Sequence, residues 1–205
     1  MNSWNLAGTI LKHGIIGKEY PKLWVQVELN APKELTLPNN KFFINFDLDN
    51  NPSSKNGRAG EYVKSRLTTH TFFFIHDAMI AKLSKSKKQE DGTWTKEEII
   101  GVKGKISNIT FYNKRVEAIN LGLVQGKVLS FNHDTTTNTS KFLVEERYRN
   151  VKTGEWKSRE IPLLHIGSVG EDLTNKYVFV TAFLCGTTPD NQSKIYGLVK
   201  NLFIT

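Results

Sequence analysis

Apolar and polar residues alternate over short segments of this sequence, and this pattern limits the possible folds more than any other. Every second residue is apolar over residues 23–29 and again over residues 42–48. This period of two is typical of a β-strand with one buried face. Turn-forming pairs such as Asp91-Gly92 separate further short runs that are rich in β-branched and aromatic residues. These runs lie at residues 72–75, 99–106, 116–124, 123–131, 142–148, 161–166, 177–184 and 195–204.

Helical signals are scarce. The best candidate is residues 77–85, where Asp77 can cap the N-terminus and Met79, Ile80 and Leu83 share a face. A shorter turn is predicted at residues 169–174. Many short strands with one short helix predict an all-β protein built as a small barrel or sandwich.

The order of these segments repeats along the chain. Each half begins with an Asn-Leu strand, at Asn5-Leu6 and at Asn120-Leu121, and the similar runs 114–124 and 194–204 end the two halves. Five strands with a connection between the third and the fourth is the plan of the OB fold. The sequence therefore predicts tandem five-stranded OB-type β-barrels, an N-terminal one with insertions at residues 1–119 and a C-terminal one at residues 120–205. Chance similarity among β segments is the alternative.

The charge favours an acidic partner. The net charge is +8, and residues 1–119 hold 18 Lys and Arg against 12 Asp and Glu, whereas residues 120–205 hold 10 against 8. An excess of this kind suits a phosphate backbone, contacted mainly by the first half, although it also fits simple solubility.

The single cysteine excludes an intrachain disulfide and a cysteine-based zinc cluster. Cys185 follows an apolar run, so we expect it to be a small buried residue. The first nine residues lack the pattern of a secretory signal, and no apolar run has the length of a membrane span. We therefore expect a cytoplasmic protein without membrane association.

The most informative segment for function is residues 147–159, R-Y-R-N-V-K-T-G-E-W-K-S-R. Gly154 suits the turn of a protruding β-hairpin. Cations neutralise phosphates, and aromatic faces stack on unpaired bases with about 1–3 kcal/mol per base, so this composition favours single-stranded nucleic acid. The alternative is a solvated hairpin with a cross-strand aromatic pair. The candidate binding residues here are Arg147, Tyr148, Arg149, Lys152, Trp156, Lys157 and Arg159.

Further segments combine aromatic rings with cations. Residues 55–66 follow a flexible stretch, residues 85–96 contain an Asp-Gly turn, and residues 111–115 are predicted to form a hairpin tip. Trp24 lies on the polar side of its predicted strand. The candidate binding residues in these places are Trp24, Lys55, Arg58, Tyr62, Lys64, Arg66, Lys87, Lys88, Trp94, Phe111, Tyr112, Lys114 and Arg115.

Residues 147–167 resemble the second hairpin and third strand of bacterial and phage single-stranded DNA-binding proteins. Residues 39–49 resemble the second strand of that family, and residues 69–79 resemble its third strand where it runs into the helix. The resemblance implies an OB fold that coats single-stranded DNA with little sequence preference during replication, recombination or repair. It also implies stacking on Tyr148 and near Phe111 and Tyr112, in a bacterial or phage-infected cell.

The sequence departs from that family in three places. Thr69 stands where the family has a stacking Trp, and residues 22–38 are predicted to add an extra strand. The disordered linker and acidic C-terminal tip of the family are missing, so recruitment of repair enzymes through such a tip is not expected. Because relatives combine about four OB barrels, the resemblance allows a homodimer, although the sequence shows no interface signature.

No catalytic arrangement is expected. His76-Asp77 and His133-Asp134 lack the companion ligands of a metal hydrolase, and no Gly-rich phosphate loop occurs. We therefore expect a non-enzymatic protein without a cofactor or a metal. Two other readings stay open at this stage: an OB-type protein-interaction or assembly module, whose binding should be insensitive to salt, and an RNA-binding protein.

Overall fold

The computed structural model describes residues 1–17, 21–29, 41–49, 51, 53–68, 70–117, 119–150, 153–186 and 195–205, without the side chains of Asn56 and residues 85–88. Within this part of the chain, all strands belong to one eleven-stranded sheet. The elements are β1 (Asn2–Ile16), β2 (Lys22–Leu29), β3 (Lys41–Asp47), α1 (Lys55–Leu67), β4 (Phe72–Lys88), β5 (Trp94–Gly104), η1 (Ile106–Asn108), β6 (Ile109–Tyr112), β7 (Ile119–Asp134), β8 (Thr139–Arg149), β9 (Trp156–Ile166), β10 (Tyr177–Gly186) and β11 (Ile195–Ile204).

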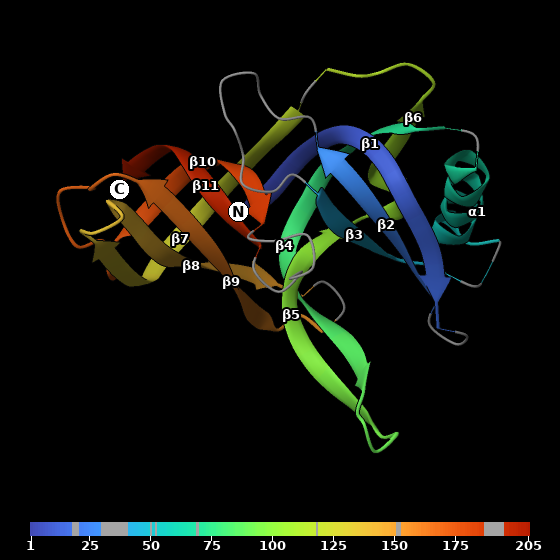
Figure 1. Ribbon diagram of the computed structural model, residues 1–205, viewed down its shortest axis with the longest axis horizontal. Coiled ribbons are helices and arrows are strands. Elements are labelled where there is room, and N and C mark those ends of the chain that lie inside the picture. The colour runs from blue at the N-terminus through green and yellow to red at the C-terminus, as the bar shows by residue number, and fades with distance from the viewer. Residues whose placement is uncertain are drawn as a thin grey trace.

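The sheet closes on itself twice. The first ring has the order β1-β2-β3-β5-β4 and closes through the pairing of β4 with β1; the second has the order β7-β8-β9-β11-β10 and closes through β10 and β7. The pairs β3–β5 and β9–β11 are parallel, so in each ring the third and fifth strands in chain order run in the same direction. The other pairs are antiparallel. This is the OB topology, repeated in one chain, and the two barrels lie side by side in Figure 1.

Strand periodicity builds each core. Along β2 and β3 the apolar positions of the alternation are buried, whereas Trp24 and Phe43 on the other face stay partly exposed. The expected strands at 23–29 and 42–48 are therefore confirmed. Residues 22–29 are the second strand of the first barrel rather than an insertion. The residues compared with the second and third strands of the family therefore fall in β3 and β4, the third and fourth strands here.

A matching asparagine occurs at the start of both barrels. Asn2 donates from Nδ2 to the Ile80 carbonyl at 2.7 Å and accepts from the Ile80 N–H at 3.1 Å. Asn120 makes the same two bonds with Leu184, at 3.0 and 2.7 Å. The repeat thus aligns Asn120 with Asn2 and not with Asn5. Residues 119–124 begin β7, the first strand of the second barrel, so the likeness of residues 114–124 to residues 194–204 does not mark a repeat.

The helix lies elsewhere than expected. Residues 77–85 belong to β4, whose long hairpin with β5 extends away from both barrels (Figure 1). Asp77 does not cap a helix; it has a φ of 52° at an irregularity in the pairing of β1 with β4. The helix is α1, where the side chain of Ser54 accepts a hydrogen bond from the Gly57 N–H at 2.8 Å.

The second barrel has a turn-rich connection, at residues 167–176, in the place of α1.

Cys185 is fully buried, as expected, and burial raises the pKa of its thiol to about 12. Among the described residues, no helix is long and apolar enough to cross a membrane.

Candidate nucleic-acid interface

The outer face of the first barrel carries an aromatic pair on its second and third strands. Trp24 and Phe43 point outward, with ring centroids 5.6 Å apart. Gly14 of β1 leaves the space that the indole occupies, because a Cβ atom there would lie 2.6 Å from the Trp24 ring. The exposed Lys12 and Lys22 lie on the same face of β1 and β2, in positions set by the strand register. This face combines a stacking surface with cations.

A lateral row of side chains continues from this pair toward the second barrel. Trp24 is in register with Asn45, Asn45 with Lys103, and Lys103 with Met79. Lys103 also forms an ion pair with Asp47 at 2.5 Å. Because residues in register on adjacent strands share a face, the row crosses the whole outer side of β2, β3, β5 and β4.

The corresponding face of the second barrel carries Trp156 and a groove. Trp156 is 66% exposed and lies opposite Arg149 near the end of the β8–β9 hairpin, while Arg147 lies opposite Ser158 on the same face. Nε of Arg149 donates to the Gly154 carbonyl at 3.0 Å, at a turn where Gly154 has a φ of 72°. The sequence prediction of a protruding basic and aromatic hairpin therefore corresponds to an observed hairpin.

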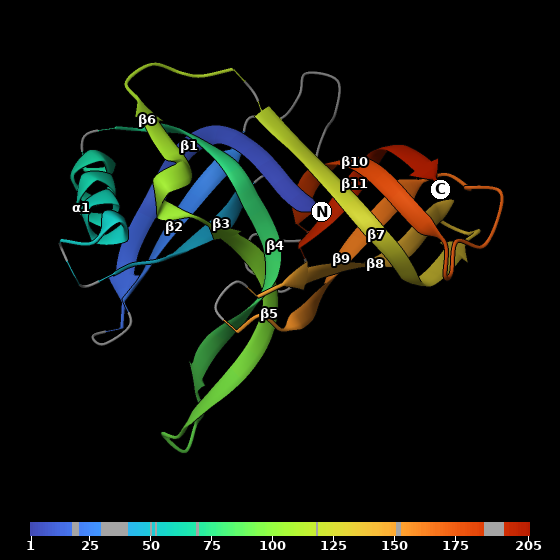
Figure 2. The ribbon, with the colours of Figure 1, turned by 180° about the vertical axis from the view of Figure 1, so that it is seen from behind.

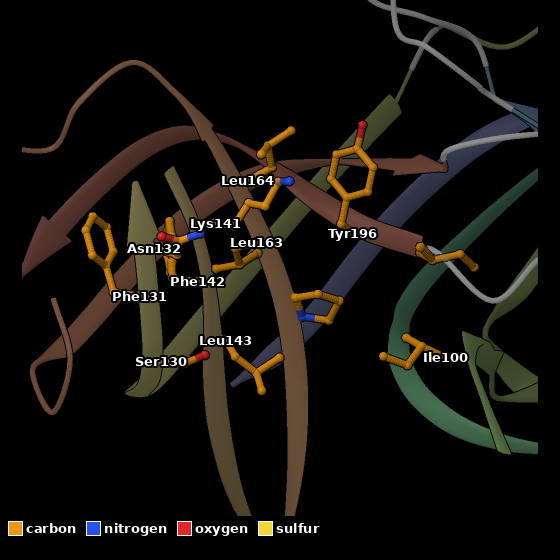
Figure 3. Close-up of a pocket in the computed structure, with 12 residues that line it drawn as sticks. Ile100, Ser130, Phe131, Asn132, Lys141, Phe142, Leu143, Leu163, Leu164 and Tyr196 are labelled. Atoms are coloured by element: carbon orange, nitrogen blue, oxygen red, sulfur yellow. The ribbon is translucent and has the colours of Figure 1, made fainter. Parts of the chain in front are cut away.

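The groove has a volume of about 640 Å³ and lies closer to the body of the barrel than Trp156 does. Figure 3 shows Lys141, Leu164 and Tyr196 near one another, with Ile100 of β5 facing them from the first barrel. Burial raises the pKa of Tyr196, and the neighbouring Cys185 adds to the effect; both favour the neutral form of the phenol. Leu143 and Pro162 add apolar surface to the lining.

Tyr148 lies on the opposite face of the hairpin from Trp156. It is paired with Lys157, one residue out of phase with the Arg149–Trp156 pair. The guanidinium carbon of Arg159 lies 3.8 Å from the Tyr148 ring centroid, and Nη1 of Arg159 contacts Met79 Sδ at 3.0 Å. The two aromatic candidates of this hairpin, Tyr148 and Trp156, therefore do not form one binding face. Tyr148 faces the first barrel.

Helix α1 gathers a third set of the predicted residues. Arg58, Tyr62 and Arg66 follow one another at intervals of four residues and are exposed, and Arg66 lies over the Tyr62 ring at 5.2 Å. Lys64 forms an ion pair with Glu61 at 2.7 Å, and Lys55 begins the helix. Figures 1 and 2 place α1 at the end of the first barrel that is remote from the second barrel. This set is therefore separate from the row that begins at Trp24.

Phe111 needs correction as a stacking residue. Its ring is only 7% exposed and packs against Tyr62 and His70, because β6 pairs with the apolar start of β4. Tyr112 is exposed, but it ends β6, and Lys114 and Arg115 begin the connection to the second barrel. Residues 111–115 are therefore not a hairpin tip.

The other predicted residues fall at or near hairpin ends. Trp94 begins β5 and is 69% exposed. Lys87 and Lys88 lie in β4, but their side chains are outside the described part of the structure, as is the whole of Lys152. The residues that sequence reasoning missed are Phe43, Lys12, Lys22, Asn45, Lys103, Lys141 and Tyr196.

The two His-Asp pairs of the sequence are not arranged as a metal site in the described part of the chain. His76 Nδ1 lies 3.4 Å from Asp77 Oδ2. No group of three or more His, Cys, Asp or Glu among the described residues is arranged to hold a metal ion. His133 contacts the Ser140 hydroxyl at 3.0 Å, and Asp134 accepts backbone hydrogen bonds from Thr136 and Thr137, as turn residues do.

Comparisons with known proteins identify the fold. No family model and no curated protein matches the sequence. Two crystal structures of the single-stranded DNA binding protein from Thermus aquaticus do match the structure. A deletion mutant gives a TM-score of 0.64 at 11% identity over 100% of this chain and 94% of that chain. The wild-type protein gives 0.60 at 10% identity over 100% and 93%. This protein therefore shares the tandem-barrel fold of the Thermus aquaticus protein over its full length.

Proposed function

We propose that this protein binds single-stranded DNA with little sequence preference and without catalysis. The observation that carries the proposal is that both barrels expose rings and cations on the same topological face, formed by strands among the first three of each barrel. In the first barrel these are Trp24 and Phe43 with Lys12 and Lys22. In the second barrel Trp156 and Arg149 fill this role.

This arrangement discriminates between single strands and duplexes. Exposed rings can stack on any unpaired base, whereas a duplex hides the faces of its bases. Lys and Arg contact phosphates without regard to sequence, so the affinity should depend strongly on salt. The Thermus aquaticus protein that shares this fold is a single-stranded DNA binding protein, which supports the same class of ligand.

The proposed biological role follows from this binding mode. A protein that coats single strands serves replication, recombination or repair, and it would act in the cytoplasm of a bacterial or phage-infected cell. Residues 1–119 and 120–205 would act as two OB-like domains on one strand.

Titration of labelled oligo-dT, followed by fluorescence anisotropy at low and at high salt, tests the proposal. We expect tight binding at low salt, with log K falling linearly with log salt by about 0.7 per phosphate contact. Unlabelled duplex should compete poorly. Absence of binding at low salt, or equal affinity for duplex, would reject the proposal. Stronger competition by oligo-U than by unlabelled oligo-dT would indicate an RNA-binding protein instead.

A further inference from the structure

A basic cleft of about 420 Å³ lies between the two barrels. Its lining includes the cations Lys82, Lys103, Lys105 and Arg159, together with Tyr148 and Ser158. No Asp or Glu belongs to the described lining. The cleft therefore presents positive charge from both barrels at the place where they approach each other.

Carboxylates next to the cleft balance only part of this charge. Glu160 lies 3.7 Å from Lys82, and Asp47 lies 2.5 Å from Lys103. No carboxylate of the described residues lies within 4.0 Å of the Lys105 ammonium. Exposed ion pairs contribute about 0–1 kcal/mol each, so a phosphate can share or replace these partners at little cost.

Arg159 is held more firmly than the lysines. It lies over the Tyr148 ring at 3.8 Å, contacts Met79 Sδ at 3.0 Å and pairs with Glu146 at 3.4 Å. Its side chain is 21% exposed. Since these contacts join β4 of the first barrel to the hairpin of the second, Arg159 is a positioning residue that fixes Tyr148 at the wall of the cleft.

The cleft continues the row on the first barrel. From Trp24 the register leads through Asn45 and Lys103 to Met79, which touches Arg159 of the second barrel. With about 4.8 Å between neighbouring strands, the row from β2 to β4 spans roughly 14 Å. A single DNA strand that stacks on Trp24 and follows this row of side chains therefore arrives at the cleft.

We infer that the cleft binds the phosphodiester backbone of one single strand as it passes from the first barrel to the second, through Lys82, Lys103 and Lys105. The inference rests on the proposed function and adds a path to it. Each barrel holds part of the same strand, so binding to the second barrel becomes intramolecular once the first is occupied. The affinity should then rise steeply when an oligonucleotide is long enough to cross the cleft.

The test compares the double variant Lys103→Ala/Lys105→Ala with Lys127→Ala/Lys176→Ala in the full chain. The control removes the same charge, likewise from one ion-paired lysine and one other, and neither of its residues lines the cleft or the groove. The probes are oligo-dT of roughly 8 and roughly 32 nucleotides, which match the site sizes of one and two OB folds. Circular dichroism and thermal melting verify that both variants are folded.

For the long probe, the cleft variant should lose about tenfold in affinity relative to the control, and its salt slope should fall by about 1.4, or 0.7 for each lost contact. For the short probe, the two variants should differ by less than about threefold. Equal affinity and slope for the long probe in the two variants overturn the cleft while leaving the proposed function intact. Failure of the wild-type protein to bind either probe overturns the proposed function itself.

Discussion

The indole ring of Trp4 lies against Gly122 so closely that a Cβ atom on Gly122 would be 2.3 Å from Cε3 of the ring. Trp4 belongs to β1 of the first barrel and Gly122 to β7 of the second, and the two residues are in register. The far edge of the ring reaches Gly197 of β11, where a Cβ atom would be 2.9 Å from Cη2. Trp4 is fully buried, so one side chain joins the cores of the two barrels.

Replacement of Gly122 by alanine should destabilise the protein. The new methyl group has no space beside the Trp4 ring, and overpacking of this kind costs about 1–3 kcal/mol. Urea denaturation followed by circular dichroism should show a lower midpoint. Gly60→Ala is the control, because the nearest atom to a Cβ added there is the Leu48 Cδ2 methyl at 3.3 Å, and alanine favours a helix over glycine. A loss of stability in the control as large as that in Gly122→Ala would contradict this explanation.

The asparagine that bridges β7 and β10 gives a second stability prediction. Asn120→Ala removes both partners of the buried Leu184 backbone, and each unsatisfied group costs about 1–3 kcal/mol. Asn201→Ala should have a small effect, since its hydrogen bond to Thr181 at 2.8 Å is exposed. Denaturant titration of the two variants measures the difference, and equal midpoints would show that the Asn120 bridge does not stabilise the second barrel.

The strands and the number of barrels could be anticipated from the sequence, because an apolar period of two is a local signal. The helix could not. Residues 55–67 contain Gly57 and Gly60 and bury few apolar side chains, so their helical periodicity is weak. Residues 77–85 have helical spacing in Met79, Ile80 and Leu83, but pairing of β4 with β5 over ten residues prevails over that local preference.

The candidate site was harder to predict, because the face of the sheet on which a side chain lies depends on the register between paired strands. The sequence places Trp156 and Tyr148 in the same basic and aromatic segment. Only the pairing of β8 with β9 shows that they point to opposite sides. Phe43 carried the same signal as Trp24, an aromatic ring at the polar phase of an alternating strand. Lys103 gave no local signal, since its place in the row depends on the parallel pairing of β3 with β5.

Trp156 should contribute directly to DNA binding. Trp156→Ala removes a stacking surface, so we expect the affinity for oligo-dT to fall by about 1–3 kcal/mol. Ile166→Ala is the matched control, because Ile166 is 64% exposed on the same strand and the same face but lies at its other end. Anisotropy titrations measure both affinities. If the two variants bind equally well, the hairpin is not a stacking platform.

The intrinsic fluorescence of the protein supplies an independent measure of stacking. Trp4 is fully buried, whereas Trp94 and Trp156 are largely exposed. Bases that stack on Trp156 should quench its emission, and the quenching by oligo-dT should therefore be smaller in Trp156→Phe than in the wild-type protein. Unchanged quenching in that variant would place the bound bases elsewhere.

The hydrogen bond between Ser3 and Asp77 should make stability depend on acid pH. Ser3 Oγ donates to Asp77 Oδ1 at 2.7 Å across β1 and β4, and this bond, with His76 adding to it, lowers the pKa of Asp77. The charged carboxylate is therefore favoured by folding. Its contribution to stability is present above the unfolded pKa of about 4 and is lost as the pH falls through the lower folded value.

Ser3→Ala removes the main cause of this shift, so the variant should be less stable than the wild-type protein near neutral pH, and the difference should disappear in acid, once the pH is below the folded pKa and Asp77 is protonated in both. The effect should be modest because Asp77 is exposed. Urea midpoints measured across this range for Ser3→Ala, with Ser158→Ala as the control, provide the measurement. A stability difference that stays constant with pH would show that the Ser3 hydroxyl acts through packing rather than through the charge of Asp77.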